Sequence, residues 1–149
     1  MPSKIERDAG YEYLVIEACR VLAGTDCSFH IGGFGRSDWG LDVEYDMSAF
    51  VEQLPELLAG VRERRLVEVD LYPPGVERTL EFDPTGDSVD IRCLSRTDWT
   101  PDPVVETIEF AELEQMLVDT AVNIANALTA SGSTISRLAP FSDWQRRVV

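Results

Sequence analysis

Basic residues are scarce in this chain of 149 amino acids. It has 13 Lys and Arg against 27 Asp and Glu, for a formal net charge of -14, and Lys4 is the only lysine. Binding to a nucleic-acid duplex depends on clustered Lys and Arg that contact phosphates. Attraction to an anionic membrane surface depends on the same groups. The composition therefore argues against a nucleic-acid partner and against a membrane partner.

Histidine and cysteine are also rare. His30 is the only histidine, and the three cysteines, Cys19, Cys27 and Cys93, include no CxxC pair. A structural zinc site usually needs four such ligands, and nucleophile–histidine catalysis would have to use His30 without a GxSxG motif. We therefore predict no metal, no cofactor and no catalytic residue. We interpret the cysteines as buried free thiols in a reducing compartment.

Long hydrophobic runs are missing as well. No run approaches the roughly 20 residues needed to span a bilayer, and residues 1–10 lack the apolar segment of a signal peptide. We therefore expect a cytoplasmic protein. Hydrophobic residues still make up 44% of the chain, which is enough to build a core without disulfides. This length predicts a single domain over residues 1–149, with residues 1–10 and 134–149 as loose ends.

Hydrophobic periodicity and turn residues predict an α+β fold. Apolar residues recur at helical spacing over 49–63 and 109–130, and Pro55 should kink or split the first of these helices. Strands are expected between turn residues over 27–34, 39–45, 66–72, 76–83, 88–94 and 104–108. The predicted architecture is a mostly antiparallel sheet of about six strands with two helices packed on one face.

The segment Tyr11–Leu22 fits two structures. Its apolar residues form a helical stripe. Its β-branched and aromatic residues, and the following turn over 23–26, are instead typical of the first arm of a hairpin. We favour the strand.

Acidic residues occupy alternate positions in the expected strands. Side chains of a strand alternate between the two faces of a sheet. Acids at even positions in 42–46 and 68–70, and at odd positions in 77–83, should therefore share one face, opposite the apolar residues of the same strands. Such a face either keeps an acidic protein soluble or forms a platform for a cationic partner.

We predict that this face binds a basic protein. The candidate partner-binding residues are carboxylates of the expected strands and two tryptophans at the sheet rim, where aromatic residues can anchor an interface: Asp42, Glu44, Glu68, Asp70, Glu81, Asp83, Asp90, Trp39 and Trp99. The tryptophans could instead seal the core, because each follows a Ser/Thr-Asp pair that favours local turns. The alternative functions are a self-associating accessory module, such as a homodimer, and a small enzyme with an acidic pocket.

Two further motifs are too incomplete to indicate a ligand. The run Gly32-Gly33-Phe34-Gly35 lacks both the GxGxxG spacing and the lysine of a phosphate-binding loop. The acidic residues of 42–46 have the spacing of the first ligands of a calcium-binding loop. However, Met47 and Gln53 occupy the positions where that loop has Gly and Glu.

Three acidic segments dominate the middle of the chain. They are Gly40-Leu41-Asp42-Val43-Glu44-Tyr45-Asp46, Val67-Glu68-Val69-Asp70-Leu71 and the flank Ser48-Ala49-Phe50-Val51-Glu52-Gln53-Leu54. In style, this region resembles the small acidic immunity proteins of bacterial polymorphic toxin systems. Members of that class typically act as stoichiometric inhibitors of a cognate toxin, often a cationic nuclease. The resemblance implies a non-catalytic inhibitor that masks a basic toxin domain, and it transfers no residue role.

Overall fold

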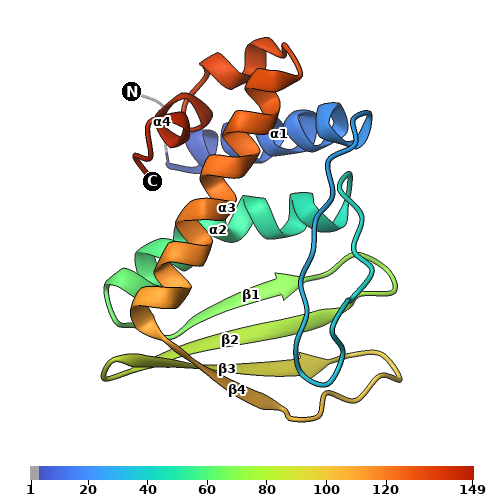
Figure 1. The fold of residues 1–149 in the computed structure, drawn as a ribbon, viewed down its shortest axis with the longest axis vertical. Coiled ribbons are helices and arrows are strands. Elements are labelled where there is room, and N and C mark those ends of the chain that lie inside the picture. The colour runs from blue at the N-terminus through green and yellow to red at the C-terminus, as the bar shows by residue number, and fades with distance from the viewer. Residues whose placement is uncertain (1–3) are drawn as a thin grey trace.

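The structure, a computed structural model, describes residues 4–149 and the side chains of residues 10–149. Within this range it contains a four-stranded antiparallel sheet and four α-helices (Figure 1). The helices are α1 (Lys4–Ala23), α2 (Asp46–Arg62), α3 (Phe110–Ala130) and α4 (Phe141–Gln145). The strands are β1 (Val67–Leu71), β2 (Arg78–Thr85), β3 (Ser88–Ser95) and β4 (Val105–Glu109). A 3-10 helix, η1 (Thr134–Arg137), precedes α4.

The sheet is a simple meander in which each strand pairs with the next in the order β1-β2-β3-β4. β2 and β3 are joined by a tight turn at Gly86-Asp87, where Gly86 has φ of 61°. Glycine adopts this conformation without the strain that a Cβ would cause. The predicted strands at 66–72, 76–83, 88–94 and 104–108 match β1 to β4. The α+β class and the antiparallel sheet are therefore confirmed.

The helices lie on one face of the sheet, and the other face is left uncovered (Figure 1). α2 packs along β1, and α3 starts directly after β4 and contacts β3 and β4. Burial alternates along β1 as strand geometry requires, since Val67, Val69 and Leu71 are buried and the residues between them are exposed. α1 packs on α2 and α3, and α4 packs on α3. The prediction of two helices is therefore too low, although α2 and α3 are the two that were expected.

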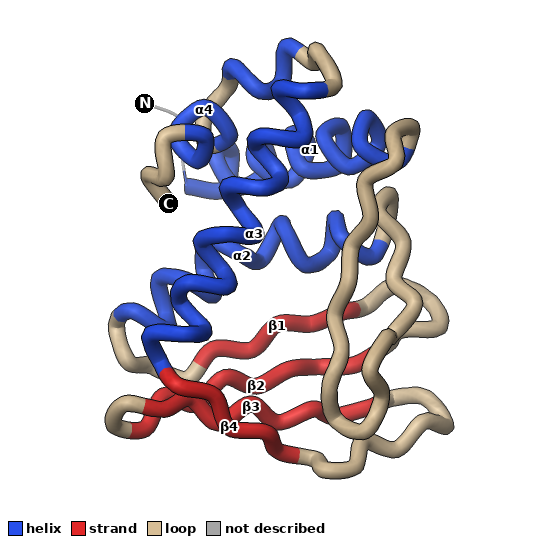
Figure 2. Tube along the Cα trace, viewed as in Figure 1, coloured by secondary structure: helices blue, strands red, loops and turns tan. Residues whose placement is uncertain are grey.

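The expected strands in the N-terminal part are wrong. Tyr11–Leu22 belongs to α1, and the segments 27–34 and 39–45 belong to a long loop between α1 and α2 that runs down beside the sheet and back (Figure 2). Along its described length, this loop has one isolated β-bridge, between Gly33 and Arg36. The sheet therefore has four strands and not about six.

Burial decides between the two structures that fit Tyr11–Leu22. Val15, Ala18, Cys19 and Leu22 recur at helical spacing, and each is at most 1% exposed. Packing this stripe against α2 and α3 buries it completely. Tertiary burial of this kind outweighs the weak strand preference of individual β-branched residues.

α2 is continuous across Pro55, so the predicted split does not occur. A proline in a helix removes the N–H that would bind the carbonyl four residues earlier, which is that of Val51. Here the hydroxyl of Tyr11, on α1, donates a hydrogen bond of 2.7 Å to this carbonyl. Burial also raises the pKa of Tyr11, which keeps the hydroxyl in its donating form. A side chain of the neighbouring helix thus replaces the backbone bond that Pro55 removes.

The ends of the chain are more ordered than expected. In the predicted loose end at 1–10, residues 1–3 lie outside the described residues and 4–10 belong to α1. The predicted loose end at 134–149 is wrong, because η1 and α4 pack against α3. Phe141 is 0% and Trp144 4% exposed, and their rings meet edge to face at 5.3 Å. Both rings belong to the hydrophobic core, which anchors this short segment on α3.

We predict that Tyr11→Phe lowers the free energy of unfolding by about 1–3 kcal/mol, because it leaves the Val51 carbonyl buried without its donor. Urea denaturation measures this change. Tyr13→Phe is the matched control, since Tyr13 is 63% exposed and should tolerate the loss of its hydroxyl.

A double-mutant cycle isolates the proposed cause. In a Pro55→Ala background, the restored backbone N–H can donate to Val51, so Tyr11→Phe should cost clearly less. An equal loss in both backgrounds would show that the Tyr11 hydroxyl does not compensate for the proline.

Candidate functional site

The face of the sheet turned away from the helices carries most of the predicted carboxylates. Glu68 of β1 stands directly opposite Glu81 of β2, and Asp83 of β2 stands directly opposite Asp90 of β3. Each is exposed or half-buried, while the alternate residues of the same strands are largely buried. We call Glu68, Asp70, Glu81, Asp83 and Asp90 the acidic sheet face. The structure therefore brings these five predicted residues together.

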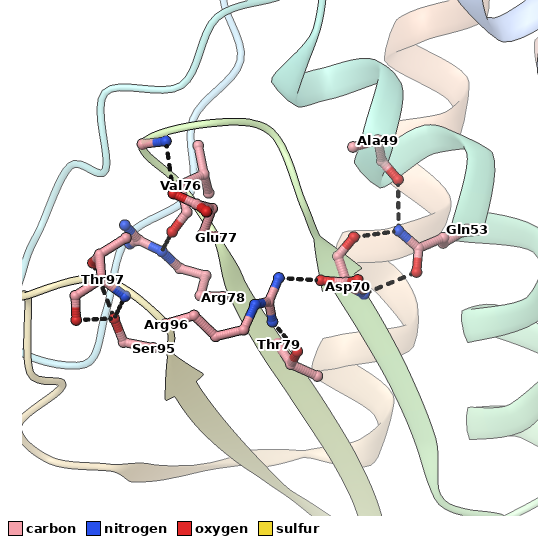
Figure 3. Close-up of polar contacts among 11 residues, drawn as sticks. Ala49, Gln53, Asp70, Val76, Glu77, Arg78, Thr79, Ser95, Arg96 and Thr97 are labelled. Carbon is pink, nitrogen blue, oxygen red and sulfur yellow. Dashed lines mark hydrogen bonds and ion pairs between the residues drawn. The ribbon is translucent and has the colours of Figure 1, made fainter.

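Two arginines also lie on this face, and one of them neutralises Asp70. Arg96, just after β3, places Nη2 2.6 Å from Asp70 Oδ1 and donates from Nη1 to Thr79 Oγ1 at 2.6 Å (Figure 3). Arg92 stands opposite Glu81 in the β2–β3 register. Among residues 10–149, no ion pair within 4.0 Å joins an arginine to Glu68, Glu81, Asp83 or Asp90. Their charge therefore remains available to a partner.

The like-charged pairs on this face oppose sheet formation. Like charges directly opposite each other on neighbouring strands destabilise a sheet by up to about 1 kcal/mol per pair. Glu68–Glu81 and Asp83–Asp90 are two such pairs in adjacent ladders. The buried side chains on the other face of the same strands offset this repulsion.

The outer edge of β1 is partly closed by Gln53 of α2. Its side-chain amide accepts from the Asp70 N–H at 2.8 Å and donates to the Asp70 carbonyl at 2.7 Å (Figure 3). These are the bonds that a further strand would make. Occupied edge groups discourage strand addition by another chain, and the contact fixes the backbone that carries Asp70.

Asp42 and Glu44 do not lie on the acidic sheet face, which corrects their expected placement. The segment that contains them turns into α2. Asp42 Oδ1 accepts from the N–H groups of Tyr45 at 2.7 Å and Asp46 at 2.9 Å, and the Asp42 N–H donates to Asp46 Oδ2 at 2.9 Å. Asp42 thus stabilises the turn that leads into α2 through side-chain bonds to the backbone. Glu44 lines a surface hollow together with Ile16 and Arg20 of α1.

Trp39 and Trp99 belong to the core and not to the rim of the acidic sheet face. Trp39 is 6% exposed, and its indole N–H donates to the Gly33 carbonyl at 3.2 Å. Trp99 is half-buried, and the two rings meet at 5.8 Å with an interplanar angle of 63°. This position agrees with the alternative in which both tryptophans seal the core.

The guanidinium of Arg78 lies over both tryptophan rings. Its carbon is 4.5 Å from the Trp39 ring centroid and 4.4 Å from that of Trp99, and the residue is 3% exposed. Nε donates to the Val76 carbonyl at 2.9 Å, and burial lowers the pKa of Arg78. The contacts join the loop before α2 and the loop after β3 to the start of β2. Sequence reasoning missed this cluster, although Arg78 shares the apolar phase of β2 with Leu80 and Phe82.

The thiols are poorly suited to nucleophilic chemistry. Cys19 and Cys93 are buried, Cys27 is half-buried, and all are free. Burial raises the pKa of Cys19 to about 12 and that of Cys93 to about 11, so both are protonated at neutral pH. A thiol must ionise before it acts as a nucleophile or metal ligand. In the part of the chain with described side chains, no three His, Cys, Asp or Glu residues converge to form a metal site.

Close packing accounts for part of the glycine run at 32–35. A Cβ at Gly32 would overlap the carbonyl oxygen of Ser37, and one at Gly35 would overlap that of Asp102. Gly35 also has φ of 91°, which a residue with a Cβ rarely adopts. The glycines therefore let the loop fold tightly onto the segment before β4.

Comparison with protein-family models, curated proteins and solved structures finds no match to this chain. None of the helices in residues 4–149 combines the length and the apolar character needed to cross a bilayer.

We predict that Arg78→Lys lowers the free energy of unfolding by about 1–3 kcal/mol, because an ammonium group cannot stack flat against two indole rings. Arg96→Lys is the matched control. Its guanidinium is exposed and pairs with Asp70, so its replacement should cost less than about 1 kcal/mol. Equal losses in urea denaturation would show that stacking contributes nothing at Arg78.

Proposed function

We propose that this chain is a non-catalytic binding protein that masks a basic protein through its acidic sheet face. The observation that carries the proposal is the pairing of Glu68 with Glu81 and of Asp83 with Asp90 on the uncovered side of the sheet. A face that exists only to stay soluble can alternate both signs and avoid this repulsion. A cationic partner would relieve it by inserting Arg or Lys between the carboxylates.

The surroundings of the carboxylates suit a protein partner better than a free ion. Leu94 of β3 is 41% exposed, and its register with Thr79 places it on the same face. Val105 of β4 is opposite Arg92 and lies there too. Interfaces combine such apolar contacts with a charged surround. Charge complementarity would speed encounter and select the partner.

The partner we favour is a toxin domain, with this chain as its cytoplasmic, immunity-type inhibitor. Toxin domains of this kind are often cationic. An inhibitor that masks such a domain by binding it one to one needs a rigid, preformed surface and no catalytic group. The sheet supplies that face, since its backbone is fixed by pairing along all four strands. A homodimer through the same face is disfavoured, because it would bring two acidic surfaces together.

The test uses fluorescent nona-arginine as a cationic probe and compares two variants with the same change in net charge. One is Glu68→Gln/Glu81→Gln/Asp83→Asn on the acidic sheet face. The other, Glu12→Gln/Asp26→Asn/Glu44→Gln, removes carboxylates of α1 and the long loop. Exposed ion pairs contribute up to about 1 kcal/mol each, so the first variant should raise Kd by about tenfold at low ionic strength. The second should change it little.

Salt dependence supplies the control for mechanism. Binding to the wild-type chain should weaken strongly as ionic strength rises, and the first variant should lose much of that dependence. Equal affinities for the two variants would mean that nona-arginine responds to net charge alone, and the proposed face would be wrong.

The toxin assignment has its own test. The protein encoded directly upstream would be co-expressed with the wild-type chain and with each charge variant. A basic domain that co-purifies with the wild type and the loop variant, and is lost with the sheet-face variant, would support it. Equal retention of that domain by all three chains would contradict it.

A further inference from the structure

A large cavity lies on the other side of the sheet, between β3 and β4, α3 and the long loop. Its volume is about 730 Å³, which falls within the range of about 300–1,000 Å³ typical of small-molecule sites. The floor is apolar and buried, with Phe82 4%, Leu113 4% and Leu117 6% exposed. The mouth includes Met116, which is 53% exposed, and His30 of the loop.

The cavity results from the way the helices cover the sheet. α2 packs along β1, where the covered residues Val69 and Leu71 are 0% and 1% exposed. α3 is tied to the end of β4 and rises away from the sheet (Figure 1). Ile91 and Ile108 share the covered face but remain half-buried, and both line the cavity. Apolar surface that the fold does not bury is therefore left concave and accessible.

A carboxylate projects from the covered face into this apolar surrounding. Glu106 is opposite Ile91 in the β3–β4 register, and on the four strands it is the one acidic residue of that face. Its Oε1 accepts from the Phe34 N–H at 2.9 Å, which holds the loop over the cavity. Among the described side chains and backbone, no donor contacts Oε2. One carboxylate oxygen thus binds the loop backbone, and the other lies near Gly33 of the same loop without a hydrogen bond to a described donor.

The other charged groups of the lining have the same sign. Glu112 of α3 joins Glu106, and the described lining contains neither Lys nor Arg. Glu109 also borders the cavity, but its position opposite Ser88 places its side chain in the phase of the acidic sheet face. Carboxylates on an otherwise apolar wall repel fatty acids and phosphate esters and attract organic cations. Their arrangement around an apolar floor matches a molecule with an apolar body and one basic nitrogen.

We propose that this cavity binds a small amphiphilic amine, with the apolar body against the sheet and α3 and the ammonium group at Glu106 and Glu112. The site is separate from the acidic sheet face and does not depend on the function proposed for it.

The test uses three probes with one apolar body: 4-phenylbutylamine, 4-phenylbutanol and 4-phenylbutyrate. Isothermal titration calorimetry with the wild-type chain should give the lowest Kd for the amine, about tenfold below that of the alcohol, the size expected for one charge-assisted hydrogen bond. The carboxylate should bind more weakly than the alcohol. Failure of the amine to bind saturably, or equal binding of all three probes, would overturn the proposal.

Two variants separate charge from structure. Glu106→Gln keeps an oxygen that can accept from Phe34, and Glu112→Gln changes an exposed residue, so neither should alter the loop. Together they should bring the amine's Kd to that of the alcohol and leave alcohol binding unchanged. An unchanged amine preference would overturn the role of these carboxylates.

Two further variants locate the site. Ile108→Trp should fill the cavity and abolish binding of both amine and alcohol, with thermal unfolding as the check on folding. Glu68→Gln/Glu81→Gln/Asp83→Asn should leave amine binding unchanged. Loss of amine binding in this last variant, and not in the cavity variants, would place the amine on the acidic sheet face and refute the cavity.

Discussion

The alternation of mostly apolar with mostly polar and acidic residues along β1, β2 and β3 is the constraint on which this structure depends. Period-two geometry sends Val67, Val69 and Leu71 to one face and Glu68 and Asp70 to the other. Burying the first face requires helices, and α2 and α3 supply them. Leaving the second face in water keeps its carboxylates solvated. A shift of one residue in pairing would bury acids and expose the core.

Two polar side chains inside the core, Tyr11 and Arg78, join elements that are far apart in the sequence. The Tyr11 hydroxyl binds the Val51 carbonyl that Pro55 leaves without a backbone donor. Arg78 lies against Trp39 and Trp99 at the end of the sheet. Both contacts join segments that are distant in sequence, so they add specificity to an apolar core that would tolerate other packings. Because α3 rises away from the sheet after β4 (Figure 1), the space between them is less filled, and the cavity lies there.

The sequence predicts the second half of the fold well because its signals are local. Turn residues at 73–75 and 84–86 separate strands in which apolar and polar residues clearly alternate. The apolar residues from Leu113 to Leu128 recur at helical spacing alone. The segments before α2 lack such signals. Tyr11–Leu22 fits both periods, and only burial against α2 and α3 decides for the helix. Phe141 and Trp144 are too few to show a periodicity, yet their burial orders the C-terminal segment.

Strand alternation predicts the candidate site correctly where a strand forms, and it fails where the segment forms a turn or a loop. Glu68, Asp70, Glu81, Asp83 and Asp90 are placed correctly because strand parity fixes their side. Asp42 also alternates with apolar residues, but its carboxylate accepts backbone N–H groups at the start of α2. Local bonds of this kind between an Asp side chain and the backbone compete with strand formation, and periodicity alone cannot detect them. Arg96 reaches Asp70 from a loop, so its pairing follows from tertiary structure alone.

The most direct test of the acidic sheet face is to locate a bound cation by NMR. Nona-arginine would be titrated into the 15N-labelled chain at low ionic strength while backbone amide shifts are followed. Amides around Glu68, Glu81, Asp83 and Asp90 should shift first and saturate together, and those of α1 and the long loop should move little. Shifts spread evenly over all acidic surfaces would contradict it.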